Sequence, residues 1–436
     1  MDSASGFSSG VLDSRRVREV ASGRVSWQRV AGIGARFWLV ARRQPLCVAL
    51  PLCVAIVEFL ATAAGAPPPS IAVLRHPFAC IAAATIYARF LIHEVDTRTR
   101  CWIVYLTPTT LLLAWLEHRQ GIPAPLLGLN LLFALGVFGV LGFALAAWRS
   151  STRDERNRHL RALAQALVLP LAGSMVPFGL WSTYSVNPVY DARIYAFEEI
   201  LGVRFSLLGV ASYRVLFPLS AIATVCYSFL PFGLALVAAK QRSFAREGDV
   251  LLATIAAGTI GFFLYFVCPV VGPLQAFAPP YPHALPPAPP GVPLLTAMTG
   301  VPRNGMPSLH TAWALIIWWN ARPLPAVWRQ VARLFAALTI WAAMGLDDTH
   351  WFTDIVVGVP LAVAIQSACV TARVDASRTT WTRMLACAAS TAAWLAAFRL
   401  GRPLLDAPPL LAWLAVAVSV AWPLASQRSA ALRSER

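Results

Sequence analysis

Charged side chains are scarce in this 436-residue chain, where Asp, Glu, Lys and Arg together make up only 13% of the residues. Soluble domains carry roughly 25% charged residues, so the composition excludes a soluble enzyme with a hydrated surface. Disorder is excluded as well, because 58% of the residues are hydrophobic and the chain has 16 Trp and 22 Phe. Together with a mean hydropathy of +0.62, these values predict a polytopic membrane protein.

Paired cysteines and a signal peptide are also missing. The eight cysteines lie in or beside apolar runs, and no two of them form a CxxC motif. We interpret them as small buried hydrophobic side chains, with a disulfide or metal site as the alternative.

The first 45 residues are rich in Arg and Ser and lack a short apolar core with a small-residue cleavage site. They are typical of a cytosolic tail.

Long apolar runs dominate what the sequence does contain. A helix needs about 20 mostly apolar residues to cross the hydrocarbon core. The sequence predicts an all-α bundle of about 12 spans by that measure. The expected spans are 46–65, 77–92, 101–117, 126–147, 162–184, 208–239, 250–269, 308–320, 333–347, 353–372, 384–400 and 408–424. The run 208–239 is unusually long, and we expect Pro218 or Pro231 to kink it.

Positive charges gather in alternate loops. The connections 149–161, 240–249, 320–333 and 372–383 hold 14 Arg and Lys residues, whereas 185–207, 270–307 and 348–352 hold three. Because positive loops stay in the cytoplasm, both termini should be cytoplasmic and the second set of loops should face outward. The net charge of +16 is then explained by topology and anionic membrane lipids. No nucleic-acid partner is expected, and no oligomeric state is indicated.

Two outward segments differ from ordinary loops. Residues 187–206 place Tyr190, Ile194, Phe197 and Leu201 on one helical face, opposite acidic residues. This pattern predicts an interfacial helix, and a plain connector without a role in any site is the alternative. Residues 269–293 contain ten prolines, which predicts a stiff irregular cap in place of a regular helix.

The first cluster of chemically active residues is 303–311, with the sequence RNGMPSLHT. Pro307 suits the first turn of a helix, and backbone N–H groups at a helix N-terminus favour an anion. Ser308 and His310 add side-chain donors, and Arg303, with Asn304 beside it, can supply a bidentate positive group. The segment is therefore a candidate phosphate site.

The second cluster is 345–354, with the sequence GLDDTHWFTD. His350 and Asp354 stand four residues apart, so on a helix they would share one face. The carboxylate could then fix the imidazole tautomer and leave the other ring nitrogen free to attack. Ionisable groups at membrane depth are candidates for function because they are costly to bury.

Each cluster also has a structural interpretation. A histidine at a helix end is often a capped interfacial residue, and aspartates favour a helix N-terminus through its dipole. A zinc site would need three or four convergent ligands, and neither HExxH nor paired cysteines are present, so no metal is expected. The two clusters are predicted to face the same side of the membrane, which favours one shared site.

The two clusters together resemble the signature motifs of a known family. Residues 306–310 (MPSLH) followed by His350 and Asp354 resemble the second and third signature motifs of the type-2 phosphatidic acid phosphatase superfamily. The Pro-Ser-Leu-His form is similar to the branch of inositol phosphorylceramide synthases and their bacterial relatives, the inositolphosphotransferases. Residues 265–273 (YFVCPVVGP) add to the likeness, which covers roughly 160–372.

The resemblance implies roles for named residues. His350 would attack phosphorus to form a phosphohistidine, oriented by Asp354, and His310 would give a proton to the leaving alcohol. Ser308 would hold a phosphate oxygen. No metal or other cofactor is implied, because Arg and backbone N–H groups can stabilise the transferring phosphoryl group.

The chain departs from the phosphatase pattern at its cations. Lys240 is the only lysine and falls on the predicted cytoplasmic side, and Met344 stands where the family usually has an Arg. Arg303 is then the main candidate cation, with Arg193 or Arg214 as supplements. Fewer cations suggest a substrate less charged than a phosphomonoester, such as a phosphodiester lipid.

The sequence thus predicts an integral membrane phosphotransferase that moves an inositolphosphate-like headgroup between lipids. A lipid phosphate phosphatase is the alternative enzyme, and a transporter or scaffold is the alternative of another class. The expected substrate is a phospholipid or lipid phosphate, and the expected location is a bacterial inner membrane with the site on the extracytoplasmic side. The expected organisation is a tail (1–45), a four-helix region (46–150), a six-helix phosphatase-like core (160–372) and a two-helix C-terminal region (373–436).

Overall fold

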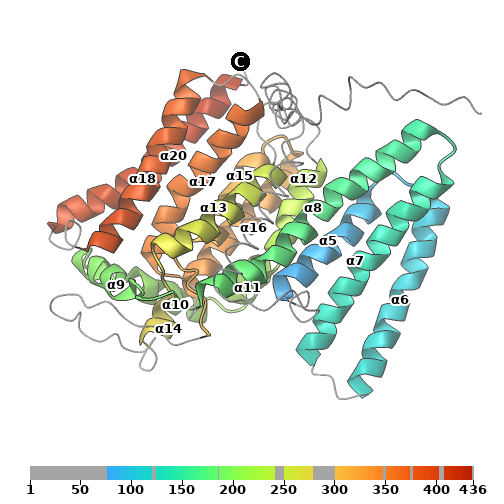
Figure 1. The fold of residues 1–436 in the computed structure, drawn as a ribbon, viewed down its shortest axis with the longest axis horizontal. Helices are drawn as coiled ribbons and strands as arrows, with labels where there is room; N and C mark the ends of the chain where they lie inside the picture. Colours follow the sequence, from blue (N-terminus) through green and yellow to red (C-terminus); the bar gives the residue numbers. More distant parts are fainter. Residues whose placement is uncertain are drawn as a thin grey trace, which may run out of the picture.

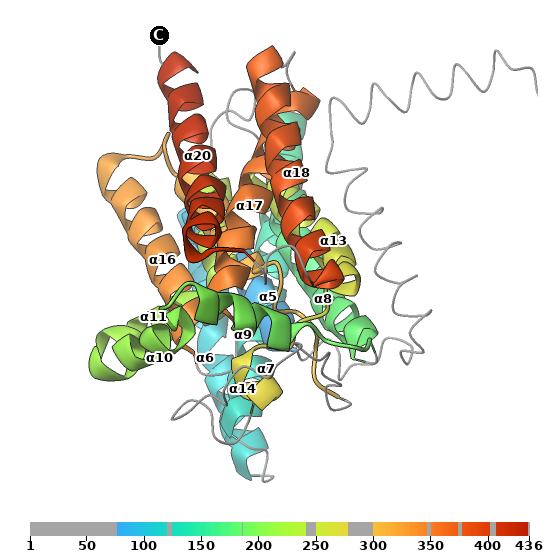
Figure 2. The same ribbon diagram turned by 90° about the vertical axis from the view of Figure 1, so that its left-hand side faces the viewer.

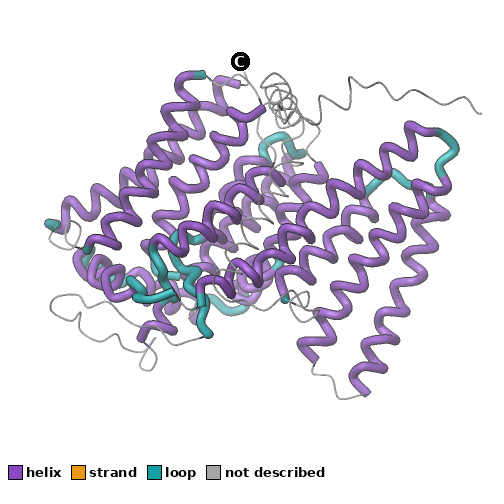
Figure 3. Tube along the Cα trace, in the orientation of Figure 1, coloured by secondary structure: helices purple, strands orange, loops and turns teal. Residues whose placement is uncertain are grey.

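The computed structural model describes residues 76–119, 124–184, 186–240, 250–277, 300–346, 350–373, 377–401 and 407–434. These residues form helices joined by loops, and no strand occurs among them (Figure 3). The prediction of an all-α protein is therefore confirmed for the described chain. The expected span 46–65 and most of the proline-rich cap, together with Asp347 and Asp348, lie outside the described residues.

The helices fall into three groups along the molecule (Figure 1). The N-terminal group lies on the right and contains α5 (Pro77–Ile92), α6 (Thr97–Arg119), α7 (Ala124–Arg149) and α8 (Arg153–Thr183). The central group contains α12 (Leu230–Lys240), α13 (Val250–Val267), α15 (Leu309–Asn320), α16 (Ala326–Gly345) and α17 (Phe352–Arg373). The third group, on the left, is α18 (Arg378–Leu400) and α20 (Pro409–Ser434).

The main hydrophobic core lies in the central group, where α13 packs against α15 and α17. Its fully buried members include Ala253, Ala314 and Ile317. On one side α8 and α12 cover this core, and on the other α17 packs against α18 and α20. The starts of α15 and α17 are thereby held between helices that lie far apart in the sequence.

Glycines allow the closest helix contact of the N-terminal group, between α5 and α7. A Cβ atom at Gly136 would lie 2.7 Å from the carbonyl oxygen of Ala83, and one at Gly139 would lie 2.5 Å from the nitrogen of Tyr87. Any larger residue would push the backbones apart. Small residues at an interface are a common way for membrane helices to pack closely.

Helix length and composition identify the candidate membrane spans. Among the described residues, α7, α8, α13, α17 and α20 are long and apolar enough to cross a membrane, which gives five spans, or six if one bent helix pair counts as a span. These spans support an integral membrane protein, but the expected count of 12 is not confirmed. The predicted spans at α5, α12 and α15 are helices of only 16, 11 and 12 residues.

The expected single span 208–239 is wrong. This stretch forms three short helices, α10 (Phe205–Val215), α11 (Leu219–Ser228) and α12. The axes of α10 and α11 are bent by 115° at Pro218, which lacks the N–H that a continuous helix requires. Pro231, by contrast, lies in the first turn of α12, where a proline is tolerated.

A layer of short helices crosses one end of the bundle (Figure 2). It contains α9 (Asp191–Ile200), α10 and α11, with α14 (Pro273–Phe277) beside them. The helix predicted within 187–206 is therefore present as α9. The expectation that residues from 269 onward hold no regular helix is wrong at α14, which is a single five-residue helix.

The C-terminal helices hold α9 in place. The indole of Trp413 on α20 donates a hydrogen bond to the carbonyl oxygen of Leu201 (3.1 Å), and Arg193 on α9 donates to that of Phe398 at the end of α18 (2.7 Å). Buried rings of Phe197, Trp394 and Phe398 fill the space between them. Of the six cysteines that the structure describes, five are buried as predicted and Cys101 is exposed.

Candidate active site

His350 lies two residues before α17, and Asp354 lies in the first turn of that helix. Both side chains are buried, and Nδ1 of His350 is 3.5 Å from Oδ2 of Asp354. The expectation that the two residues share a helix face is wrong, because the helix begins only at Phe352. They meet instead because the backbone N–H of Trp351 donates to Oδ2 of Asp354 (2.9 Å) and folds the preceding segment over the helix end.

This arrangement gives the two ring nitrogens of His350 different surroundings. Nδ1 faces the carboxylate at a distance slightly longer than an ordinary hydrogen bond, and such contacts commonly tighten when substrate binds. An Nδ1–H held by Asp354 leaves Nε2 with its lone pair, which is the form that can attack phosphorus.

His310 lies in the first turn of α15 and faces the same site. Its ring centroid is 5.9 Å from that of His350, with the two ring planes inclined by 62°. The ring of Tyr227 on α11 stacks on His310 with a centroid distance of 3.9 Å. The structure therefore brings together two histidines that stand 40 positions apart in the sequence. Tyr227 was not predicted, because no spacing pattern distinguishes it from other aromatic residues of the membrane helices.

Ser308 connects the two histidine segments. Its backbone N–H donates to the carbonyl oxygen of Asp354 (3.0 Å), and its hydroxyl caps α15 by accepting from the N–H of Thr311 (3.3 Å). Pro307 precedes this cap, so the expectation that it occupies the first helical turn is wrong. Because the Ser308 oxygen accepts from Thr311, its own O–H can still donate to a phosphate oxygen.

The guanidinium of Arg303 is buried and mostly committed to backbone carbonyls. Nε donates to the carbonyl oxygen of Val186 (3.0 Å), and Nη1 donates to that of Val301. Nη2 is buried without a hydrogen-bond partner. In this conformation Arg303 can therefore offer Nη2 to an anion. The bidentate contact expected from the sequence would also need Nε or Nη1, and both of these atoms are hydrogen-bonded to carbonyl oxygens.

The two supplementary cations lie elsewhere. Arg193 is engaged by the end of α18, and Arg214 is exposed on α10. Among the described residues, no group of three or more His, Cys, Asp or Glu side chains could hold a metal ion.

Two buried acids of α9, Asp191 and Glu198, support the histidine segment, and neither was predicted to belong to the site. Asp191 accepts hydrogen bonds from the indole N–H of Trp351 (2.9 Å) and from the backbone N–H groups of Val271 (3.1 Å) and Gly272 (2.9 Å). It thus ties the residue next to His350 to the segment after α13. The only signal was its place on the acidic face of the amphipathic pattern, where a solvated side chain is the default expectation.

Glu198 caps α17 from outside the helix. It accepts from the backbone N–H of Thr353 (3.2 Å) and from the hydroxyl of Ser206 (2.8 Å). The Ser206 oxygen in turn accepts from the N–H of Phe352 (3.2 Å). Two of the N–H donors in the first turn of α17 are satisfied in this way. Burial raises the pKa of the Asp191 carboxyl to about 7, and burial likewise raises the pKa of Glu198 to about 7.

The titration of Glu198 predicts a pH-dependent stability. Burial raises its pKa from 4.5 to about 7, so the folded protein binds this proton more tightly than the unfolded chain does. The stabilisation from this tighter proton binding is complete below the pKa of Glu198 in the unfolded chain. It is lost as the pH rises through the pKa of Glu198 in the folded protein. We expect the melting temperature of the detergent-solubilised protein to fall between about pH 5 and about pH 8. The fall should be smaller for Glu198→Gln, and equal falls in the two proteins would contradict the assignment.

Close packing of α17 on the start of α15 predicts an effect of Gly358→Ala. The added Cβ would lie 2.8 Å from the carbonyl oxygen of Ser308, so the two helices must separate. Overpacking of this kind costs about 1–3 kcal/mol, and here it moves Asp354 relative to His310. We expect a lower melting temperature and lower phosphate-ester turnover. Gly128→Ala, with no atom within 4 Å of its Cβ, is the matched control and should change neither.

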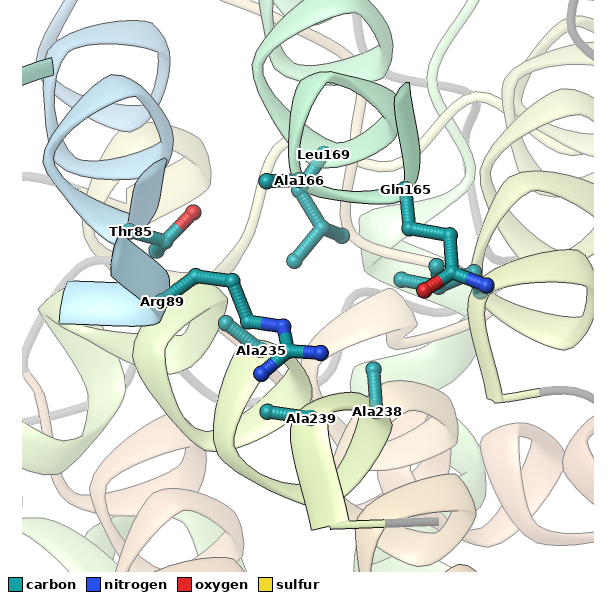
Figure 4. A pocket seen from close by; sticks show the side chains of 9 residues that line it. Thr85, Arg89, Gln165, Ala166, Leu169, Ala235, Ala238 and Ala239 are labelled. Atoms are coloured by element: carbon teal, nitrogen blue, oxygen red, sulfur yellow. The ribbon is translucent and has the colours of Figure 1, made fainter. Parts of the chain in front are cut away.

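One cavity contains His310, and another lies away from the histidines. The first, of about 230 Å³, is also lined by Asn304 and Tyr227. The second, of about 30 Å³, lies between α5, α8, α12 and α13, and the side chains of Arg89 and Gln165 reach toward it (Figure 4). His310 lines the first of these cavities and not the second, and His350 lines neither of them.

A comparison with known families gives one match whose range includes the candidate site. Residues 192–368 match a family model described as the PAP2 superfamily, and both histidines and Asp354 lie within that range. No curated protein and no solved structure matches the chain. Members of this superfamily are generally phosphatases or phosphotransferases, which supports an enzyme. The residues that the structure describes are therefore helical with candidate membrane spans, and residues 192–368, which contain both histidines, are similar to the PAP2 superfamily.

Proposed function

We propose that the protein is an integral membrane phosphotransferase that moves a phosphoryl headgroup between lipids through a phosphohistidine at His350. The observation that carries the proposal is the pairing of His350 and His310, 5.9 Å apart, with buried Asp354 on Nδ1 of the first. A nucleophile with its orienting carboxylate and a separate acid are the parts that such a displacement needs.

The first half-reaction breaks the bond between phosphorus and the lipid oxygen. Nε2 of His350 attacks phosphorus, the electron pair of the breaking bond goes to the lipid oxygen, and His310 gives that oxygen a proton. In the second half-reaction the acceptor hydroxyl returns a proton to His310 and attacks phosphorus, which releases His350. Nη2 of Arg303 and the hydroxyl of Ser308 are the groups proposed to hold the phosphate oxygens.

Burial of the site favours an alcohol over water as the acceptor. His350 is 3% exposed and Asp354 is fully buried, so water has little access to the phosphohistidine. Transfer to a lipid or polyol hydroxyl is therefore preferred over hydrolysis by a lipid phosphate phosphatase of the same superfamily. We place the site on the extracytoplasmic side, as the distribution of Arg predicts.

The test is to trap the phosphorylated enzyme and then offer it acceptors. Purified protein is incubated with phosphatidylinositol or phosphatidic acid carrying labelled phosphate, and the label on the protein is measured after an alkaline quench. We expect label on wild type and none on His350→Gln. Added diacylglycerol, ceramide or inositol should then collect the label in a new ester. Release only of free phosphate or free phosphorylated headgroup would contradict transfer and indicate the phosphatase.

A further inference from the structure

The cavity next to His310 has walls that come from outside the matched region. It lies between α5, α8, α13 and α15, and residues before 192 contribute Phe78 and Ile81 of α5 and Leu180 of α8. Asn304 and His310 supply polar atoms to the same space. A mostly apolar cavity with a few convergent polar groups is typical of a ligand site, and this mixture suits the junction between a polar headgroup and a hydrocarbon chain.

The α5 wall is fixed against the catalytic helix. The rings of Phe78 and Trp313 lie with centroids 5.7 Å apart, and Trp313 is one turn after His310 on α15. The indole N–H of Trp313 donates to the carbonyl oxygen of Thr254 on α13 (3.0 Å). The α8 wall approaches α13 at Gly179, where a Cβ would lie 2.8 Å from the ring of Phe262. These contacts define the shape of the cavity before any substrate enters.

The position of the cavity relative to the two histidines indicates which part of a substrate it takes. His310 lines the cavity, whereas His350 does not. In an in-line displacement the attacking and leaving atoms stand on opposite sides of phosphorus. With Nε2 of His350 attacking, the leaving oxygen faces His310, so the group attached to that oxygen extends toward the cavity.

We propose that this cavity binds the hydrocarbon of the leaving lipid alcohol and that Ile81 of α5 is a specificity-determining residue. The proposal rests on the proposed function for the direction of the displacement. It gives the N-terminal helices a role in substrate selection, because Ile81 is buried at 5% exposure and forms part of the cavity wall. The cavity takes the first part of a chain and leaves the remainder among the membrane lipids.

The first test compares substrates with and without chains. The probes are dioleoyl phosphatidylinositol and dioleoyl phosphatidic acid, with glycerophosphoinositol and glycerol 3-phosphate as chainless counterparts. We expect Ile81→Phe to lower kcat/KM for the lipid probe by roughly tenfold and to leave the chainless probe unchanged, as filling a hydrophobic subsite does. Ile92→Phe, at the exposed end of the same helix, is the matched control and should behave as wild type.

The outcomes separate the two proposals. Equal losses on lipid and chainless probes in Ile81→Phe, with wild type active and dependent on His350, would overturn the chain site and leave the proposed function standing. Turnover that persists in His350→Gln would overturn the proposed function.

The second test needs no turnover. A phosphonate analogue of phosphatidic acid carries a diazirine near the glycerol end of its chain, and its crosslinks to the full-length protein are mapped by peptide. We expect labelling of the N-terminal turns of α5 and of the end of α8, reduced by Ile81→Phe and by excess unlabelled lipid. Labelling confined to exposed positions such as Leu385 and Leu414 would overturn the chain site whatever the enzyme's activity.

Discussion

Replacing His350 by glutamine should abolish phosphate-ester turnover while the protein remains folded. Glutamine keeps a polar side chain of similar length, but it has no nitrogen lone pair that can attack phosphorus. Loss of a nucleophile in a site of this kind costs a factor of about 10³ or more in kcat, because the remaining groups cannot replace it. The measurement is turnover of labelled phospholipid per folded molecule, with folding followed by the melting temperature in detergent.

His159 offers a control matched for burial. Like His350 it is 3% exposed, but it lies on α8 and forms a 3.0 Å hydrogen bond with His93, among the N-terminal helices. If loss of a buried histidine only disturbed the fold, His159→Gln would reduce turnover as strongly as His350→Gln. We expect it to keep most of the wild-type activity per folded molecule, and equal losses would contradict a specific role for His350.

Replacing Asp191 by alanine should produce the second-largest effect, through both stability and catalysis. The change leaves the indole N–H of Trp351 and the backbone N–H groups of Val271 and Gly272 without their acceptor. A buried donor without a partner costs about 1–3 kcal/mol, so the three together predict a loss of at least about 3 kcal/mol. Trp351 is then free to shift, and His350 beside it shifts too.

The test of Asp191 must separate a positioning role from a purely structural one. We expect kcat per folded molecule to fall while KM for the phospholipid stays near the wild-type value, because Asp191 contacts the segment of the nucleophile and lies outside the proposed phosphate contacts. Asp191→Asn keeps one acceptor oxygen and should be milder in both stability and kcat. A lower melting temperature with unchanged kcat would show that Asp191 only stabilises the fold.

Much of the helical architecture follows from local sequence. Apolar runs of about 20 residues predicted α7, α8, α13 and α17. A backbone buried in hydrocarbon must form its hydrogen bonds internally, and a helix does so. Pro218 marked a break because a proline nitrogen cannot donate. The degree of bending was beyond the local pattern, since the 115° angle depends on the helices against which α10 and α11 pack, chiefly α16.

The site shows the same division between local and long-range information. The residue types at His310, His350 and Asp354 suggested phosphate chemistry by themselves. Their expected geometry on a shared helix face was wrong, because the start of α17 is set by Glu198 and Ser206 from another segment. A cap supplied from outside the helix leaves no trace in the spacing of the helix's own residues.

The sequence by itself determined that the protein is helical and embedded in a membrane, and it predicted two histidine segments whose proposed chemistry is phosphate transfer. Only the tertiary structure decided that Asp191 and Glu198 face inward, although the amphipathic pattern of α9 placed them on its polar side. The physical reason is that the segment after α13 and the first turn of α17 contain buried N–H donors, and a buried donor requires an acceptor. These two carboxylates fill that need, and the C-terminal helices that pack on α9 keep them there.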